Sequence, residues 1–429
     1  MDIIGHLKRG CITLAHIKIW ILSFFISMNA FAYEIGPEIA GFAAVHQALT
    51  SNALVCLENN IDTKKPIKCA DKVKSCIDRL AVKSSENLKN CFQTRKPSGL
   101  YLDKFSIDDL EKAVKWPDDP TYEAFGSGVA KFGAKMLQGC EGFLVKQKGL
   151  DNSIGLLCNT HFGNYQFWHA QSSTANESSK ETRQKILDWA KFNYEVAVGK
   201  IEPQDDYCKY FRENESSISA IMKPENYPFC DERLIWGWVP KLIAKPYPAW
   251  DIATLYGVSC DNPFTSILGC KEELINNGSK RADNTVVSAI GALLHLIQDS
   301  FSQSHNVRGN CFDSNPESVD NPIPVSKIVC KPITRFTNYA EFDLNTQELE
   351  AQFNHDLSDD WPYIDDGCFS SSHSPIVDDP ITASAKILWH IDKKSDWAND
   401  VLPDLESVFN IVEPSTTSGQ GVCYAMPLD

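Results

Sequence analysis

The stretch from Thr285 to His305 is the most constraining part of the sequence. Residues Thr285 to Asp299 contain no proline and place apolar side chains on most faces of a helix, which predicts a helix buried in the core. Within this helix His295 and Asp299 are four residues apart, so both side chains point to one face. Polar side chains on a buried helix face protein rather than solvent. They therefore need partners inside the fold.

His305 follows six residues after Asp299 and adds a third potential metal ligand. In a continuous helix His305 would lie on a different face from His295 and Asp299. It can approach them only if the helix ends before it, and the serines between positions 300 and 304 favour such an end. Imidazole nitrogens and carboxylate oxygens are groups that Zn²⁺ accepts as ligands. The three residues therefore predict a metal site. The alternative is a core histidine whose hydrogen bonds are satisfied by an aspartate.

The first 32 residues have the pattern of a secretory signal. Lys8 and Arg9 precede an apolar run from Ile19 to Met28, and Ala30-Phe-Ala32 matches the pattern of a cleavage site. The apolar run is too short to span a bilayer, and no later stretch approaches the roughly 20 apolar residues that a membrane helix needs. The sequence therefore predicts a soluble protein, secreted or periplasmic, that begins at Tyr33 after cleavage.

Cysteine usage fits an exported protein. One of the 15 cysteines, Cys11, lies in the signal, and the remaining 14 form an even set without a CxxC pair. We therefore expect disulfides formed in an oxidising compartment. A structural zinc–thiolate site is the alternative, and it usually needs cysteines about two to four residues apart.

The mature chain is strongly acidic. The whole sequence has a net charge of −15, and the signal holds three basic residues against one acidic residue, so the mature chain is near −17. Such a surface argues against nucleic acid as the main partner, because affinity for phosphate backbones comes mainly from Lys and Arg. It suits a zwitterionic or neutral substrate, and solubility alone is the other explanation.

The mature sequence shows no internal repeat and little strand-like alternation, which predicts a mostly helical fold. The expected divisions are a signal over 1–32, a helical domain over 33–400 with a cysteine-rich segment at 56–91 and a disulfide-held loop insertion at 306–337, and a tail over 401–429. The predicted helices are Glu38–Leu57, Ser106–Lys115, Tyr122–Leu137, Lys180–Lys200, Thr285–Asp299, Thr346–Asp356 and Ile381–Trp389.

Histidines occur in two further places where they could bind metal. His161 and His169 lie at the two ends of an aromatic run, with Thr160 as the expected N-cap of a helix. An aromatic core stripe with polar ends explains the run but not its two histidines. Further along the chain, His355 and Asp359 repeat the four-residue spacing of the first histidine–aspartate pair. A solvated acidic run is the alternative interpretation of that segment.

The pattern His-x3-Asp-x5-His, followed downstream by His-x3-carboxylate, resembles the zinc-dependent phospholipases C and the related zinc single-strand nucleases. The likeness is particularly to the larger zinc metallophospholipases C exported by gram-negative bacteria. It is carried by the segments His161–His169 and Leu294–His305, together with a histidine near the mature N-terminus and the region of His355. In that superfamily the fold is all-α and three zinc ions share one cleft. The resemblance therefore implies a multi-helix, phospholipase C-like zinc domain.

The resemblance also implies the ligands, among them the freed N-terminal amine and first carbonyl. The implied sets are Tyr33, His46 and Asp299 for one zinc; His169, His295 and Asp299, with His161 as a further candidate, for the second; and His305, His355 and Asp359 for the third. Asp299 would then bridge two ions. Asp151 is a candidate, by its order in the sequence only, for an additional aspartate near the second zinc. Asp151, His161 and Asp299 are the residues expected to take part in catalysis.

The implied reaction is hydrolysis of phosphatidylcholine-type glycerophospholipids at a membrane surface to diacylglycerol and phosphocholine, by water activated between zinc ions. A choline ammonium needs aromatic faces or carboxylates, and Tyr165, Phe167 and Trp168 are candidates, with core packing as the alternative role. Two other functions stay open. One is a secreted zinc nuclease, although such nucleases typically carry a histidine where this chain has Phe301. The other is a non-enzymatic, disulfide-rich binding protein.

Overall fold

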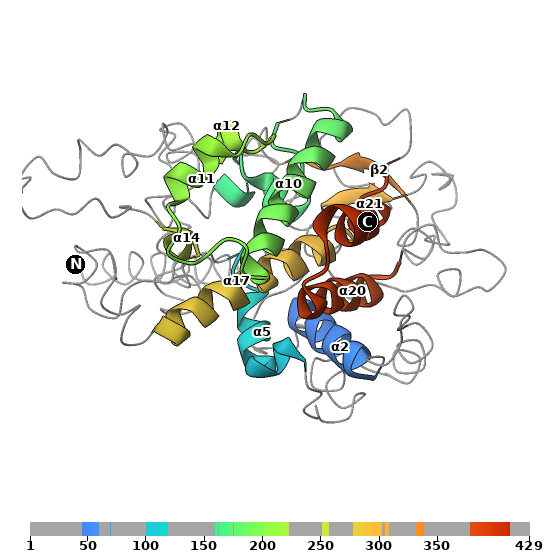
Figure 1. Ribbon diagram of the computed structural model, residues 1–429. Coiled ribbons are helices and arrows are strands. Elements are labelled where there is room, and N and C mark those ends of the chain that lie inside the picture. Colours follow the sequence, from blue (N-terminus) through green and yellow to red (C-terminus); the bar gives the residue numbers. More distant parts are fainter. Residues whose placement is uncertain are drawn as a thin grey trace, which may run out of the picture.

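The computed structural model describes residues 45–59, 69, 100–118, 159–161, 163–174, 176–222, 251–256, 278–302, 305–308, 332–338 and 378–411. Within these ranges the chain is mostly helical, which agrees with the predicted all-α class (Figure 1). The elements are α2 (Val45–Asn59), the 3-10 helix η1 (Tyr101–Lys104), α5 (Ile107–Ala113), the 3-10 helix η2 (Gln166–His169), α10 (Ser179–Ala197), α11 (Tyr207–Glu213), α12 (Ser219–Met222), α14 (Ile252–Leu255), α17 (Gly278–Asp299), β1 (Asn306–Arg308), β2 (Ile333–Phe336), α20 (Pro380–Lys393), the π-helix η7 (Trp397–Val401) and α21 (Leu402–Val408).

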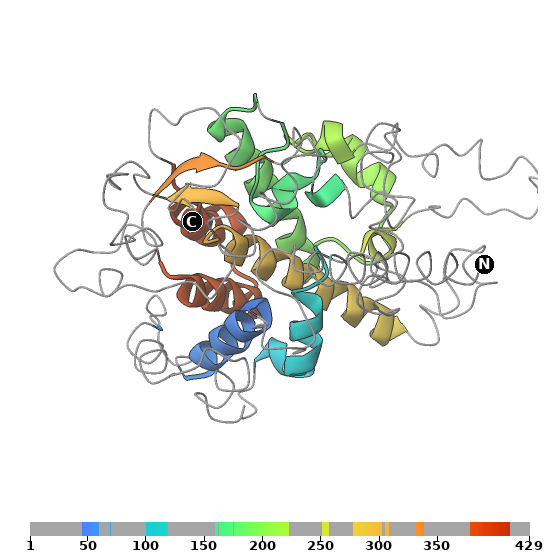
Figure 2. The same cartoon turned by 180° about the vertical axis from the view of Figure 1, so that it is seen from behind.

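Helix α17 runs through the centre of the molecule, as the views from opposite sides show (Figures 1 and 2). Helices α10, α5 and α20 pack directly against it, and α2 packs mainly against α20 and α5. Every residue from Thr285 to Ser300 is buried, as the apolar pattern predicts. The helix begins at Gly278, earlier than the predicted start at Thr285. Its polar residues therefore lie in the middle of the fold.

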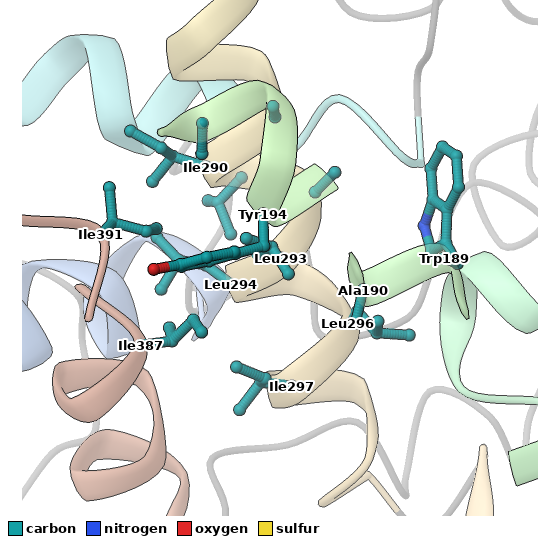
Figure 3. Packing of buried hydrophobic residues seen from close by; sticks show 14 of the residues in the cluster. Trp189, Ala190, Tyr194, Ile290, Leu293, Leu294, Leu296, Ile297, Ile387 and Ile391 are labelled. Atoms are coloured by element: carbon teal, nitrogen blue, oxygen red, sulfur yellow. The ribbon is translucent and has the colours of Figure 1, made fainter. Parts of the chain in front are cut away.

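Apolar side chains of α10, α17 and α20 pack together in the core. Figure 3 shows the side chains of α17 beside Tyr194 of α10 and Ile387 and Ile391 of α20. Leu293 and Leu294 are fully buried in this layer. Burying a Leu or Ile side chain stabilises a fold by about 1.5–3 kcal/mol. Packing against α10 and α20, more than intrinsic helix propensity, therefore holds α17 in place.

Helices α2 and α20 lie side by side, and a disulfide joins the end of α2 to the following segment. The bond links Cys56 and Cys69, which fits the expectation of disulfides in the 56–91 segment. The backbone N–H of Cys69 also donates to the Thr382 hydroxyl near the start of α20, over 3.3 Å. Asp379 caps this start by accepting from the N–H groups of Ile381 and Thr382. The disulfide is therefore anchored to the same end of α20.

Helices α5 and α17 approach each other unusually closely at Gly291. A Cβ atom placed there would lie 2.2 Å from the carbonyl carbon and oxygen of Ala113 and 2.7 Å from its Cβ. Only glycine allows this contact, because the atoms in the way belong largely to backbone. The contact sets the end of α5 directly beside the turn of α17 that carries His295.

Most predicted helices that fall within the described ranges are observed, with shifted ends. The predictions of Ser106–Lys115, Lys180–Lys200, Thr285–Asp299 and Ile381–Trp389 correspond to α5, α10, α17 and α20, and Glu38–Leu57 corresponds in part to α2. Ser106 and Ser178 cap α5 and α10, and each forms a capping box with the acidic residue three positions later. The predicted helices Tyr122–Leu137 and Thr346–Asp356 lie outside the described residues.

The prediction of a continuous loop from Asn306 to Thr337 was wrong at its two ends. Asn306–Arg308 and Ile333–Phe336 pair as antiparallel strands β1 and β2, with Asn306 opposite Phe336. The strands are too short to show alternation in the sequence, and the pairing brings distant ends of the segment together. The residues between these ends lie outside the described part of the chain.

The prediction of a tail after Asp400 was also wrong at its start. Leu402–Val408 forms helix α21, with Leu405 and Val408 buried in the core. The guanidinium of Arg183 on α10 donates to the Phe409 carbonyl over 2.9 Å. Apolar residues three positions apart, here Leu402, Leu405 and Val408, form the face that packs inward. This short helix is therefore part of the domain.

None of the described helices is long and apolar enough to cross a membrane. The predicted signal, its cleavage site and Tyr33 lie outside the described residues.

Candidate metal centre

Seven histidine and aspartate side chains from separate segments meet beside α17. They are His46 of α2, Asp118 after α5, His161, His169 at the end of η2, His295 and Asp299 of α17, and His305 before β1. All are buried except His161, whose side chain is 13% exposed. Packing of α2, α5 and η2 around α17 therefore assembles residues that are far apart in the sequence.

The end of α17 explains the placement of its ligand-type residues. His295 and Asp299 lie on one face, with Nε2 of His295 2.9 Å from Oδ2 of Asp299, which confirms the predicted i, i+4 arrangement. The helix ends at Asp299, and the Ser300 hydroxyl donates to the Ile297 carbonyl over 2.6 Å. The chain turns there and brings His305 back toward Asp299. The helix end expected from the serines is thus confirmed.

The carboxylate of Asp299 contacts four imidazoles through its two oxygens. Oδ1 lies 3.3 Å from Nε2 of His46 and 3.7 Å from Nε2 of His305. Oδ2 lies 3.0 Å from Nδ1 of His169 and 2.9 Å from Nε2 of His295. Each oxygen therefore faces a different pair of histidines, an arrangement in which one carboxylate can serve two ions.

Asp118, to which no sequence pattern pointed, forms a second centre of contacts. Its Oδ1 lies 3.4 Å from Nε2 of His295, 3.5 Å from Nε2 of His161 and 3.6 Å from Nδ1 of His169. The side chain is fully buried. Neither carboxylate oxygen has a hydrogen bond in good geometry within the described part of the chain. A buried carboxylate surrounded by nitrogen atoms at these distances is the arrangement expected around a cation.

Hydrogen bonds on the outer nitrogens orient two of the imidazoles. Nδ1 of His295 lies 2.8 Å from the carbonyl oxygen of Val114, which can only accept, so Nδ1 carries the proton. Nδ1 of His46 lies 2.7 Å from Oε1 of Gln298, whose amide nitrogen donates to the Thr50 hydroxyl. Each ring therefore directs its other nitrogen, Nε2, toward the carboxylates, which is the orientation that ligand histidines need when a metal is bound.

The spacing of these atoms fits divalent metal ions. Three overlapping groups each offer ligand atoms within 4.8 Å of one another: His46, Asp118 and His295; Asp118, His161 and His169; and His169, His295 and Asp299. Ligand atoms of a tetrahedral zinc, each about 2.0–2.1 Å from the ion, lie roughly 3.3 Å apart. The contacts of Asp118, between 3.4 and 3.6 Å, are close to this spacing. The buried histidines and aspartates can therefore hold metal.

Without metal, the charges in the site shift the pKa values of its groups strongly. Burial lowers the pKa of His295, but the charges of Asp118 and Asp299 outweigh burial and raise it to about 10. Burial and the charge of His161 lower the pKa of His169 to about 3. Burial opposes ionisation of Asp118, yet His295 holds its pKa well below the ordinary value, and the same holds for Asp299. The metal-free site thus keeps one proton on His295 between two carboxylates.

The structure brings together the predicted ligands that it describes. His46, His161, His169, His295, Asp299 and His305 all lie in the cluster. Tyr33, His355, Asp359 and Asp151 lie outside the described residues, so their proposed roles stay predictions. Asp118, which was not among the predicted ligands, contacts His161 and His169.

Asp118 was missed because its local sequence resembles a surface turn. It stands in Trp116-Pro-Asp-Asp-Pro120, where prolines and aspartates favour an exposed loop. The one local signal is Trp116, which is fully buried and stacks on Trp168 with ring centroids 5.2 Å apart. A buried tryptophan two residues before an aspartate indicates that the turn faces inward.

The aromatic run between His161 and His169 serves packing. Trp168 is fully buried between Trp116 and Trp189, and its ring is 4.3 Å from that of Trp189 and nearly parallel to it. Phe167 is fully buried and Tyr165 nearly so, which supports the packing alternative over a choline site. The expected N-cap at Thr160 is wrong. Residues 159–161 are already helical, and the Thr160 hydroxyl contacts Nδ1 of His161 instead.

Two further histidines, His373 and His390, match no part of the metal pattern, and His390 lies away from the cluster contacts. Its Nε2 is 2.9 Å from Oδ2 of Asp404 on α21. His373 lies outside the described residues.

Comparison of the chain with protein-family models, curated proteins and solved structures found no match. The resemblance to zinc-dependent phospholipases C therefore stays a prediction from the residue pattern.

Proposed function

We propose that this chain is a metal-dependent phosphodiesterase of the phospholipase C type, which uses zinc ions held by the cluster to hydrolyse glycerophospholipids. The proposal extends to export of the mature protein from Tyr33 and to additional ligands from Tyr33, His355 and Asp359. Its products would be diacylglycerol and a phosphorylated head group such as phosphocholine.

One observation carries the proposal: two buried carboxylates are surrounded by five imidazoles, each of which contacts at least one of the two. Asp118 and Asp299 both contact His169 and His295, and His46, His161 and His305 complete the group. A structural site for one zinc needs four ligands, so this set exceeds what one ion requires. A site of this size supports more than one ion, as metal-dependent phosphoester hydrolysis commonly uses.

The chain's own residues supply charge, orientation and shielding. When bound, zinc ions acidify water and neutralise charge on a phosphate oxygen. Asp118 and Asp299 provide the negative charge that retains cations, and Val114 and Gln298 orient His295 and His46 toward them. His161, with 13% of its side chain exposed, is the partly solvent-accessible member of the cluster. Burial of the others keeps their electrostatic interactions strong.

Two observations favour a phospholipid over nucleic acid as substrate. The mature chain, near −17, would repel a polyanion. Phe301 occupies the position at which related nucleases typically have a histidine, and its buried ring lies 4.5 Å from the guanidinium carbon of Arg308. That position therefore supports packing and offers no nitrogen ligand.

A metal count paired with a substrate panel tests the proposal. The exported, mature protein is analysed for zinc by atomic emission, and release of phosphorylated head group is measured with vesicles of phosphatidylcholine, of phosphatidylethanolamine and with single-stranded DNA. We expect at least two zinc ions per chain and head-group release that chelation abolishes. Cleavage of DNA alone would assign the nuclease activity. Less than one metal ion per chain would exclude the proposed chemistry and favour a binding protein.

A further inference from the structure

Thr337, the residue after β2, links two segments that carry site histidines. Its backbone N–H donates to the carbonyl of His305 over 2.9 Å, which continues the β1–β2 ladder by one step. Its hydroxyl donates to the same carbonyl over 2.6 Å and accepts from the amide of Gln171 over 3.3 Å. Its carbonyl accepts from the N–H of Ser172 over 3.0 Å. All of these residues are buried.

The two linked segments hold His169 and His305 on opposite oxygens of Asp299. His169 lies 3.0 Å from Oδ2, and His305 lies 3.7 Å from Oδ1. Their rings are stacked with centroids 5.9 Å apart. The spacing of the two imidazoles therefore depends on the spacing of their backbones, to which Thr337 is hydrogen-bonded on both sides.

The segment after His169 needs such a restraint, because its backbone is strained. Ala170 has φ of 54°, a left-handed conformation that costs a residue with a Cβ atom free energy. Gln171 and Ser172 follow directly and both bond to Thr337. These bonds hold the chain in the direction that aims His169 at Asp299.

The hydroxyl contributes a link that the backbone of residue 337 cannot provide. The backbone N–H and carbonyl bonds would form with any residue at this position except proline. Only a hydroxyl can accept from Gln171 and donate to His305 in one chain of hydrogen bonds. Such a buried chain strengthens its members and fixes their geometry.

We propose that Thr337 is a positioning residue of the metal centre, whose hydroxyl joins the Gln171 amide to the His305 carbonyl and so fixes the separation of the His169 and His305 imidazoles across Asp299. The inference deepens the proposed function and rests on its premise that His169 and His305 bind metal.

The test compares Thr337→Val with Thr337→Ser in the mature protein loaded with Co²⁺. Valine keeps the shape of threonine and removes the hydroxyl, whereas serine keeps the hydroxyl. We expect Thr337→Val to lower Co²⁺ affinity about 10–100-fold, as loss of groups that orient ligands typically does, and to change the visible absorption of the bound ion. Thr337→Ser should retain both the affinity and the spectrum of the wild type.

Two further variants separate positioning from general destabilisation. Thr182→Val makes the same change at a fully buried threonine of α10, whose hydroxyl has no hydrogen bond within the described ranges, and should leave Co²⁺ affinity unchanged. If Thr337→Val does not fold, the double variant Gln171→Met, Thr337→Val removes the donor with its acceptor, and the same loss of affinity is expected. Wild-type affinity in both Thr337→Val forms, or an equal loss in Thr337→Ser or Thr182→Val, overturns the inference.

The outcomes also distinguish this inference from the proposed function. A wild-type protein that binds Co²⁺ but hydrolyses no phospholipid contradicts the proposed function. The Co²⁺ affinities of the Thr337 variants then still decide whether Thr337 positions the site histidines. A protein that hydrolyses phospholipid with unchanged Co²⁺ affinity in Thr337→Val contradicts the positioning role alone. A wild-type protein that binds no Co²⁺ overturns both.

Discussion

His46 and Gln298 lie on different helices, α2 and α17, and Nδ1 of His46 is 2.7 Å from Oε1 of Gln298. Gln298 precedes Asp299, which contacts Nε2 of the same imidazole over 3.3 Å. The amide nitrogen of Gln298 donates to Thr50, four residues after His46 on α2. Two consecutive residues of α17, Gln298 and Asp299, therefore contact the two nitrogens of His46. The hydrogen bond to Thr50, one turn along α2, holds the Gln298 side chain in place.

Replacing Gln298 by leucine should weaken metal binding without removing a ligand. The leucine leaves Nδ1 of His46 without this acceptor, so the ring is free to rotate or change tautomer, and we expect about 10–100-fold lower zinc affinity in a chelator competition assay. Gln298→Glu is the matched control, because a carboxylate still accepts from Nδ1, and it should stay within a few-fold of wild type. Equal affinity of the leucine variant and wild type would show that His46 needs no such support.

Replacing Asp118 by asparagine should reduce the number of bound ions. The change keeps the size of the side chain and removes a charge that contacts His161, His169 and His295. We expect a lower zinc count by atomic emission and, in the metal-free protein, a fall in the pKa of His295 by NMR titration, since Asp118 is the largest influence raising it. Asp283→Asn, at a surface pair with Lys104, is the control and should change neither value. An unchanged zinc count would remove Asp118 from the site.

The metal-free protein should be most stable near pH 6.5. The pKa of His295 rises from 6.5 to about 10 on folding, so its stabilising contribution is complete below pH 6.5 and is lost as the pH rises toward 10. The pKa of His169 falls to about 3, so stability is lost as the pH falls from 6.5 toward 3. The lowered pKa values of Asp118 and Asp299 add to the loss below about pH 4.

Urea unfolding in EDTA across this pH range measures the effect. Added zinc should flatten the decline between pH 6.5 and 10, because the ions replace the proton that His295 carries in the metal-free site. A free energy of unfolding that is constant or increasing from pH 6.5 to 10 in EDTA would contradict the assigned protonation of His295.

Gly291→Ala should destabilise the protein, against the usual trend. In an exposed helix interior this change stabilises by roughly 1 kcal/mol. Here the new Cβ would stand 2.2 Å from the backbone of Ala113, so α5 would have to move, at a cost of about 1–3 kcal/mol or more. The displacement would also carry Val114 away from His295 and lower zinc affinity. Chemical denaturation and the zinc competition assay report the two effects.

A double variant that combines Gly291→Ala with Ala113→Gly on α5 tests which atoms cause the clash. This second change removes the 2.7 Å contact with Cβ but not the 2.2 Å contacts with the backbone. The double variant should therefore remain less stable than wild type. Full recovery would mean that the helices are separated further than the structure indicates.

An extra residue ahead of Tyr33 should lower activity if the freed N-terminus binds zinc, as the resemblance implies. The extension displaces the amine from the position of the first residue. A mature protein with one added alanine is compared with the protein beginning at Tyr33, by head-group release and zinc count. Full turnover and an unchanged count in the extended form would remove the N-terminal ligand from the proposal.

The sequence predicts the part of the site that lies on one helix. His295 and Asp299 share a face because of helical periodicity, and the serines that follow end the helix, so both features are local properties of residues 285–304. The burial of α17 follows from the same apolar pattern.

Residues placed by long-range packing could not be predicted in this way. Asp118 reaches His295 because α5 packs on α17 at Gly291, and nothing within the turn after Trp116 specifies that contact. The strands β1 and β2 are too short for alternation to show, and their pairing depends on the return of a distant segment. Thr160 suggested the start of an α-helix leading toward His169. In the structure His169 is instead the last residue of a 3-10 helix, which ends there because Ala170 adopts a left-handed conformation.

The close approach at Gly291 also restricts how this protein can diverge. Consider a descendant that keeps His295 and Asp299 but has a larger residue in place of Gly291. Its helices α5 and α17 must move apart, and the His295 imidazole then needs an acceptor other than the Val114 carbonyl. The glycine should therefore persist wherever this architecture is inherited. A search for Gly-x3-His-x3-Asp within an apolar helix would recover distant relatives more selectively than the two polar residues alone.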